Sequence, residues 1–127
     1  MKEFLEFEDL VGKVLTKVEN KDDEELIFTT IDGEVYKLYH EQNCCESVSI
    51  EDICGDLADL VGEPLLVAEE IAHKQGVSPK GVPKVEYQDC FTWTFYKLST
   101  RKGGVTIRWY GESNGYYSES VDFCKVA

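Results

Sequence analysis

The sequence has few basic residues, one methionine, three prolines and no long hydrophobic run. Thirteen Lys and Arg stand against 25 Asp and Glu, so the formal net charge is −12. Proteins that bind nucleic acid along its phosphate backbone need a basic surface, and this composition argues against that class. The longest apolar stretch covers residues 64–68, whereas a membrane-spanning helix needs about 20 apolar residues. We therefore predict neither backbone binding to nucleic acid nor insertion into a membrane.

Signals for export and for disulfide bonding are also missing. Residues 1–6 carry acids where a secretory signal peptide has its apolar core. A secreted disulfide framework normally has an even number of regularly spaced cysteines. This chain has five, without a Cys-x-x-Cys pair, at Cys44, Cys45, Cys54, Cys90 and Cys124. We expect a cytoplasmic protein with reduced thiols.

Catalytic signatures are the last missing class. The sequence contains no P-loop, no GxGxxG, no HExxH and no GxSxG pattern. The many carboxylates do not form a paired pattern of the kind that acid–base chemistry uses. We therefore predict a non-enzymatic protein without a cofactor.

The composition that remains is that of a globular domain. Hydrophobic residues make up 43% and charged residues 30% of the 127 positions, which is enough apolar material for one core. Most periodic segments alternate with the period of a strand. We predict a single domain over residues 1–127 of the α+β class, dominated by antiparallel sheet with one or two short helices.

The clearest local signal is an Asp-Gly pair at 32–33 between two alternating runs, 26–31 and 34–40. Asp-Gly favours a two-residue hairpin turn, because both turn positions need a positive φ. With such a loop, Phe28 lies opposite Lys37.

Other segments complete the predicted order. Helical turns are expected at 6–11 and within 47–62, each stopped by a glycine. Residues 74–84, rich in glycine and proline, are expected to be an exposed loop. The remaining runs predict strands, the last three in an antiparallel meander with a hairpin at 111–115: 14–18, 65–71, 91–98, 105–110 and 116–123.

One tetrapeptide occurs twice. Asp-Leu-Val-Gly stands at 9–12 and again at 59–62, each time before a predicted strand. An internal duplication explains this repeat, and so does a corner that simply recurs at the start of strands.

A segment that combines one arginine with three tyrosines and several hydroxyl groups covers residues 106–120. Strand alternation places Val105, Ile107 and Trp109 on the core face and Arg108 on the other face. Packing demand favours an inward Trp93 on the preceding strand, which would put Thr92, Thr94 and Tyr96 beside Arg108. Guanidinium groups bind phosphate or carboxylate, and tyrosines stack on planar rings. The predicted ligand-binding residues are Arg101, Arg108, Tyr110, Glu112, Asn114, Tyr116 and Tyr117. Alternatively, these side chains form ordinary cross-strand pairs that stabilise a hairpin.

A second candidate site is the cluster of His40, Cys44, Cys45 and Glu46. Adjacent cysteines in an extended chain point to opposite faces, whereas zinc sites space them by two to four residues. Nearby carboxylates would raise a thiol pKa and weaken a nucleophile. We predict that no metal binds here and that these residues are structural.

Charge is distributed unevenly along the chain. Residues 1–70 hold 20 acids and five lysines, a net charge of −15, whereas residues 71–127 hold five acids and eight bases, a net charge of +3. Such asymmetry indicates either a partner surface or a solvated acidic face that maintains solubility.

Two long motifs resemble a family of small phage and prophage proteins of unknown function. They are HxxxCCESVxIEDIxGDLxDLxG at 40–62 and TIRWYGESNGYYSE at 106–119. The resemblance implies a phage setting and hence the cytoplasm of a host cell. Small acidic phage proteins without catalytic motifs often antagonise host defence, by occluding a protein, by mimicking DNA or by sequestering a nucleotide signal, as the sponges against Thoeris-type systems do.

Three hypotheses follow, in this order. The first is a sponge for a nucleotide-derived signal, with Arg108 on phosphates and tyrosines on a base. The second is an acidic inhibitor or DNA mimic that occludes a host defence protein. The third is a thiol- or metal-dependent enzyme at His40, Cys44 and Cys45. A homo-oligomer is compatible with all three.

Overall fold

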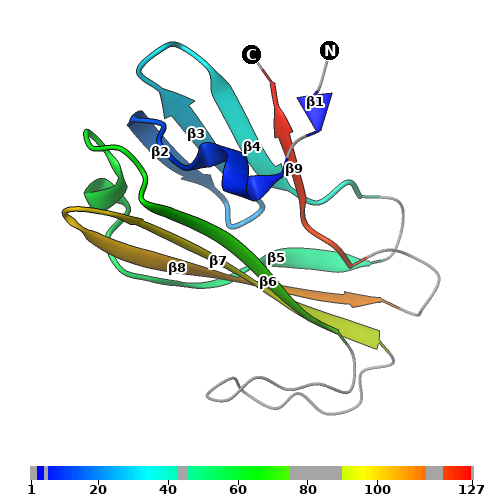
Figure 1. Ribbon diagram of the computed structural model, residues 1–127. Helices are drawn as coiled ribbons and strands as arrows, with labels where there is room; N and C mark the ends of the chain where they lie inside the picture. Colours follow the sequence, from blue (N-terminus) through cyan, green and yellow to red (C-terminus); the bar gives the residue numbers. More distant parts are fainter. Residues whose placement is uncertain (1–2, 5, 43–45, 75–89, 114–118, 127) are drawn as a thin grey trace.

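Two antiparallel sheets face each other in the computed structural model, which describes residues 3–4, 6–42, 46–74, 90–113 and 119–126 (Figure 1). The first sheet has the strand order β1-β9-β4-β3-β2, and the second has the order β5-β8-β7-β6. The strands of the first sheet are β1 (Glu3–Phe4), β2 (Leu15–Lys21), β3 (Glu25–Thr30), β4 (Val35–Tyr39) and β9 (Asp122–Lys125). The strands of the second are β5 (Ser47–Cys54), β6 (Val67–Lys74), β7 (Cys90–Thr100) and β8 (Gly103–Ser113).

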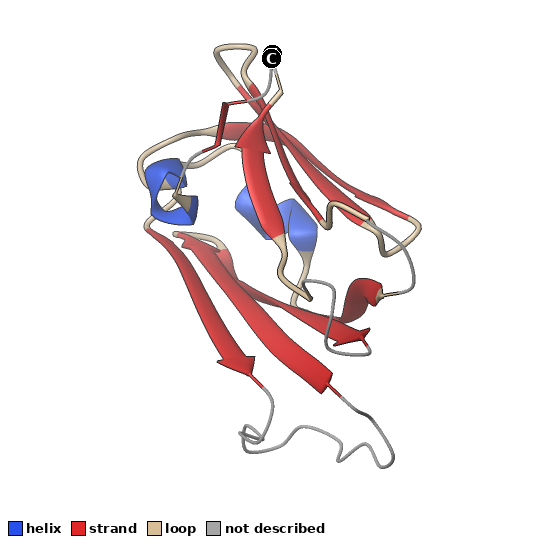
Figure 2. Ribbon diagram, turned by 90° about the vertical axis from the view of Figure 1, so that its right-hand side faces the viewer, coloured by secondary structure: helices blue, strands red, loops and turns tan. Residues whose placement is uncertain are grey.

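The predicted antiparallel sheet is confirmed, but the α+β class is wrong because the fold is mainly β. Within the described residues the helical content is two single 3-10 turns, η1 (Phe7–Leu10) and η2 (Leu57–Leu60), drawn blue in Figure 2. The helical spacing within 47–62 arises because residues 47–54 form strand β5, which buries Val48 and Ile50 by alternation. Four residues are too few to sustain an α-helix without further turns. No described helix has the length and apolar character that crossing a bilayer would require.

The predicted β3–β4 hairpin is present, but its register differs by one residue from the prediction. The loop has three residues rather than two: Gly33 N donates to Thr30 O at 3.0 Å, and Thr30 N donates to Glu34 O at 2.9 Å. Gly33 takes a φ of +87°, as in a type I turn closed by a left-handed glycine. Phe28 therefore lies opposite Tyr36, and both rings are buried in the core.

The two sheets are built on the same plan. In each, three strands that follow one another in sequence form a meander, β2-β3-β4 in the first and β6-β7-β8 in the second. The fourth strand is exchanged: β5 follows β4 but pairs with β8, and β9 follows β8 but pairs with β4. This gives the domain an internal two-fold symmetry of topology.

The repeated Asp-Leu-Val-Gly segments lie at equivalent positions in this symmetry. The first two residues of each segment end a 3-10 turn. The glycine of each segment donates to the backbone just beyond the other segment. Gly12 N donates to Leu65 O at 2.8 Å, and Gly62 N donates to Leu15 O at 2.9 Å. The structure thus favours the duplication over a corner that merely recurs.

Strand exchange also corrects the predicted meander at the end of the chain. The segment 116–123 was expected to pair with the strand of Arg108, through a hairpin at 111–115. Instead β8 lies between β5 and β7, and β9 joins the first sheet between β1 and β4. The exposed loop predicted at 74–84 lies, apart from its first residue, outside the described residues.

Aromatic rings join the two sheets. Phe7 of η1 makes edge-on contacts with Phe28 and Phe123 of the first sheet and with Tyr96 of the second, at centroid distances of 6.3, 5.3 and 4.7 Å. Such edge-to-face pairs stabilise a core beyond the area that they bury. Trp109 and Ile107 of β8 complete the same core cluster.

Glu34 bridges two lysines at the edge of the β3–β4 loop, and this makes stability depend on pH. Its carboxylate accepts from Lys13 Nζ at 3.1 Å and from Lys125 Nζ at 3.0 Å, and the hydrogen bonds from Lys125 and then Lys13 lower the pKa of Glu34. A lowered folded-state pKa stabilises the protein above the ordinary carboxyl pKa, and that stability is lost as pH falls through the lowered value. We expect Glu34→Gln to lower the urea midpoint at pH 7 and to differ less from the wild type at pH 3. An equal loss at both pH values would contradict this account.

Candidate functional site

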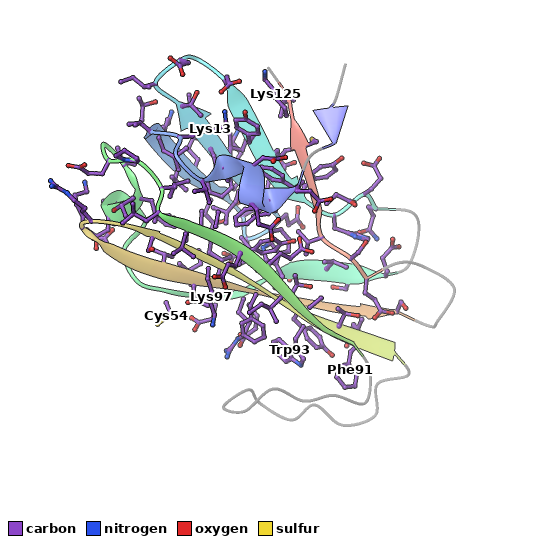
Figure 3. All side chains as sticks on the ribbon, in the orientation of Figure 1. Lys13, Cys54, Phe91, Trp93, Lys97 and Lys125 are labelled. Atoms are coloured by element: carbon purple, nitrogen blue, oxygen red, sulfur yellow. The ribbon has the colours of Figure 1, made fainter. Side chains whose placement is uncertain are left out.

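The candidate site lies on the outer face of the second sheet, which points away from the first sheet. Strand β8 alternates as predicted, with Val105, Ile107 and Trp109 buried between the sheets. Arg108 and Tyr110 therefore occupy the outer face. Figure 3 shows Trp93 and Phe91 of the neighbouring β7 on this same side.

Trp93 is buried, at 3% exposure, but the prediction that it lies on the inner face of β7 is wrong. Trp93 lies opposite Tyr110 and Thr94 opposite Trp109, so Thr94 and Tyr96 face inward. One reason is space, because Trp109 already fills the inner position and the small Thr94 fits beside it. Another is that the buried Tyr96 hydroxyl can donate to Glu70 Oε2, at 2.8 Å, on the edge strand β6.

Trp93, Arg108 and Tyr110 form one cluster, which we call the aromatic–arginine face together with Phe95. The Arg108 Cζ atom lies 5.5 Å from the Trp93 ring centroid, within cation–π range. The Trp93 and Tyr110 ring centroids are 4.5 Å apart. Phe95 lies opposite Arg108 on β7 and is half-buried. Trp93 is only 3% exposed and its ring is tilted by 52° from that of Tyr110, so the solvent-accessible part of this cluster is the half-buried Arg108, Tyr110 and Phe95.

Arg108 is held by a carboxylate that sequence reasoning missed. Its Nε and Nη2 both donate to Glu51 Oε2. Glu51 reaches this position because β5 pairs with β8 and carries a bulge between Ile50 and Asp52. The predicted neighbour, Tyr116, lies outside the described residues. No local pattern indicates a pairing of strands more than 50 residues apart.

A second carboxylate, that of Glu112, lies beside Tyr110 in this cluster. The Tyr110 hydroxyl donates to Glu112 Oε2 at 3.2 Å. Burial chiefly, then the charge and hydrogen bond of Glu112, raises the pKa of Tyr110 well above its ordinary value. Tyr110 therefore stays a neutral hydrogen-bond donor at any physiological pH.

The structure brings together three of the predicted ligand-binding residues, Arg108, Tyr110 and Glu112. Arg101 lies at the other end of β8, in the β7–β8 turn, where its Nη2 donates to Glu63 Oε1 at 3.3 Å and its side chain is 78% exposed. It does not contribute to the aromatic–arginine face. The predicted Asn114, Tyr116 and Tyr117 lie outside the described residues.

Comparison with known proteins assigns the family. The profile of the domain of unknown function DUF7448 matches residues 8–123, which include both sheets and the aromatic–arginine face. The chain belongs to the DUF7448 family. No curated protein and no solved structure matches it. The function of this DUF7448 domain therefore has to be argued from its geometry.

The second predicted site of the DUF7448 domain contains a buried histidine–carboxylate pair. His40 Nε2 lies 2.8 Å from Glu46 Oε2, and the two side chains are 4% and 0% exposed. His40 Nδ1 lies 2.7 Å from the Ser120 carbonyl, which can only accept, so Nδ1 carries a proton. The imidazole thus joins the two connections that exchange strands between the sheets.

Cys44 and Cys45 lie outside the described residues, so a thiol function beside His40 stays a prediction without a geometry. Among the residues that the structure describes, no group of three or more His, Cys, Asp or Glu is arranged to hold a metal ion. In the topological symmetry of the fold, Glu46 before β5 corresponds to Glu119 before β9. Glu119 accepts from Thr92 Oγ1 at 2.9 Å and from the hydroxyl of Ser113.

Proposed function

We propose that this DUF7448 domain is a non-enzymatic binding protein whose aromatic–arginine face occludes a partner protein. The observation that carries the proposal is the cluster on the outer face of the second sheet, in which the partly exposed Arg108 and Tyr110 pack against the buried Trp93. Tryptophan, tyrosine and arginine are the residues that dominate binding energy in protein interfaces. In the phage setting that the sequence motifs imply, the partner is a host defence protein.

Local charge favours a protein over a phosphate-bearing ligand. Arg108 already has a carboxylate partner, Glu51, and Glu112 adds a second negative charge beside Tyr110. A phosphate would have to displace Glu51 and approach Glu112. A protein surface with apolar and basic side chains would instead meet complementary charges at the rim.

The second candidate function is the sequestration of a nucleotide-derived signal. It is supported by the partly exposed Tyr110 and Arg108, which offer a ring for a base and a planar guanidinium for a phosphate. For this function the guanidinium group of Arg108 must first be released from Glu51.

A Glu51→Gln variant separates these two functions. Removing the carboxylate frees Arg108, so a phosphate-bearing ligand is expected to bind up to about fivefold more tightly, since competition from an exposed ion pair contributes up to about 1 kcal/mol. A basic partner protein is expected to bind more weakly, because it loses a complementary charge. Calorimetric titration with the isolated partner or ligand measures the sign of the change.

Photo-cross-linking in cells that produce this protein identifies the partner. The cross-linking amino acid p-benzoylphenylalanine replaces Tyr110 in one variant and Lys17, an exposed β2 residue with a 62% exposed side chain, in the control. We expect a protein adduct specific to position 110 that disappears with Arg108→Ala. If position 110 yields no specific adduct and heating releases a nucleotide from the purified wild type, the second function replaces the first. If neither is found, the aromatic–arginine face is not a binding surface.

Arg108→Ala is expected to weaken binding of either ligand class by about 10- to 150-fold, because a hydrogen bond to a charged group contributes about 1.5–3 kcal/mol. Arg108→Lys should restore little of the affinity that Arg108→Ala loses, since lysine lacks the planar guanidinium group. Titration of folded variants measures this. Unchanged affinity with a lower melting temperature would make Arg108 a purely structural residue.

A further inference from the structure

A separate pocket of about 270 Å³ lies where the β2–β3 turn, the end of β4 and the start of β5 meet. It is on the inner side of the second sheet, because Val48 in its wall faces inward, whereas the aromatic–arginine face is on the outer side. Ile50 N donates to Asp23 O at 2.6 Å and ties the turn to β5. The lining residues are Glu24, Glu25, Tyr39, His40, Gln42 and Val48.

The charges around this pocket favour a cation. Glu24 and Glu25 contribute two carboxylates, and Lys37 Nζ lies 4.0 Å from Glu25 Oε1. Glu24, Glu25 and Lys37 together sum to one negative charge, so an anionic ligand would be repelled.

The ring of Tyr39, a lining residue, already lies against one cation, the side chain of Lys37, which does not itself line the pocket. Lys37 Nζ lies 4.5 Å from the centroid of the Tyr39 ring, where the negative ring face attracts positive charge. An aromatic ring, an aliphatic side chain and carboxylates around one small cavity are the elements that recognise a flat organic cation. The volume is below that of most drug-sized pockets, so it fits a single small group.

We propose that this pocket binds a guanidinium group. A guanidinium is flat, weakly hydrated and able to donate two parallel hydrogen bonds to a carboxylate such as Glu25. An ammonium ion holds its water more strongly and loses more on entering a site with Tyr39 and Val48 in its wall. The guanidinium belongs either to a free small molecule or to the arginine side chain of a polypeptide.

Ethylguanidinium is the probe, and two-dimensional amide NMR of the whole protein is the readout. We expect saturable shifts at the amides of Glu25, Tyr39 and Val48, with weaker binding of ethylammonium. Glu25→Gln should weaken binding about three- to tenfold, the range for a charge-assisted hydrogen bond partly screened by water. Glu19→Gln is the matched control, because it removes the same charge from the same hairpin at similar exposure, 37% against 39% for Glu25. It should change the affinity less than twofold.

Three results would overturn the proposal: no saturable shifts at the pocket, equal binding of ethylammonium, or equal weakening by Glu25→Gln and Glu19→Gln. If Glu25→Gln does not fold, Glu24→Gln takes its place. A capped arginine that binds more tightly than ethylguanidinium assigns the group to a polypeptide, and equal or weaker binding assigns it to a free small molecule. Arg108→Ala should leave this binding unchanged, which keeps the pocket distinct from the aromatic–arginine face.

Discussion

Replacing His40 by alanine is expected to destabilise the fold by about 3–5 kcal/mol, because it leaves the Glu46 carboxylate buried without its imidazole partner. That is a large part of the 5–15 kcal/mol by which domains are normally stable. The same change removes the hydrogen bond to the Ser120 carbonyl, so both strand-exchanging connections lose a contact. Urea unfolding of the variant and the wild type measures the difference.

Two controls separate this effect from a general loss of charge pairs. Arg101→Ala removes an ion pair whose arginine is 78% exposed, and it should cost less than about 1 kcal/mol. A double variant with His40→Phe and Glu46→Leu replaces the pair by apolar groups and should regain much of the stability. If His40→Ala is no worse than Arg101→Ala, the pair is not important for the fold.

Gly55→Ala is expected to cost about 2–6 kcal/mol, for two reasons that add. Gly55 has a φ of +116°, a conformation that strains an alanine by about 1–3 kcal/mol. An added Cβ would also lie 2.6 Å from the Gly104 carbonyl oxygen, so β5 and the start of β8 would have to separate. Forcing extra atoms into such packing typically costs about 1–3 kcal/mol more.

Gly33→Ala is the matched control for the conformational part. Gly33 has a φ of +87°, but nothing lies within 4 Å of an added Cβ. It should therefore cost only about 1–2 kcal/mol, the penalty of a left-handed alanine. Thermal unfolding of the two variants measures the steric part by difference. Equal losses would show that the contact between Gly55 and Gly104 relaxes freely.

Both large effects arise at contacts between segments distant in sequence, and this limits what local patterns could predict. Alternation has a period of two whatever the partner strand is, so β8 was assigned correctly from Val105, Ile107 and Trp109. The Asp-Gly turn was located correctly because the conformational preference of this residue pair is local as well. The length of this turn was not predicted correctly. Phe28 pairs with Tyr36 rather than with Lys37, and that choice depends on which rings fill the core.

For β7, alternation permits two orientations, and the local composition favoured the wrong one. Trp93 is more apolar than Tyr96, so burial alone predicts the tryptophan inside. The structure reverses this because Trp109 occupies the inner layer and Glu70 accepts the Tyr96 hydroxyl. That outcome creates the aromatic–arginine face, and it depends on the packing of two sheets rather than on either strand.

The sequence by itself determined that this protein is acidic and built mainly of antiparallel sheet, that Arg108 and Tyr110 share one side of a strand, and where the β3–β4 turn lies. These properties follow from composition, from the two-residue period of strands and from the backbone preferences of glycine and aspartate. Only the tertiary structure decided that β5 and β9 change sheets, that Glu51 holds Arg108, and that Glu25, Tyr39 and Val48 surround one pocket. Each of these depends on which distant strands pair, and pairing is selected by the total burial of the whole chain rather than by any one segment.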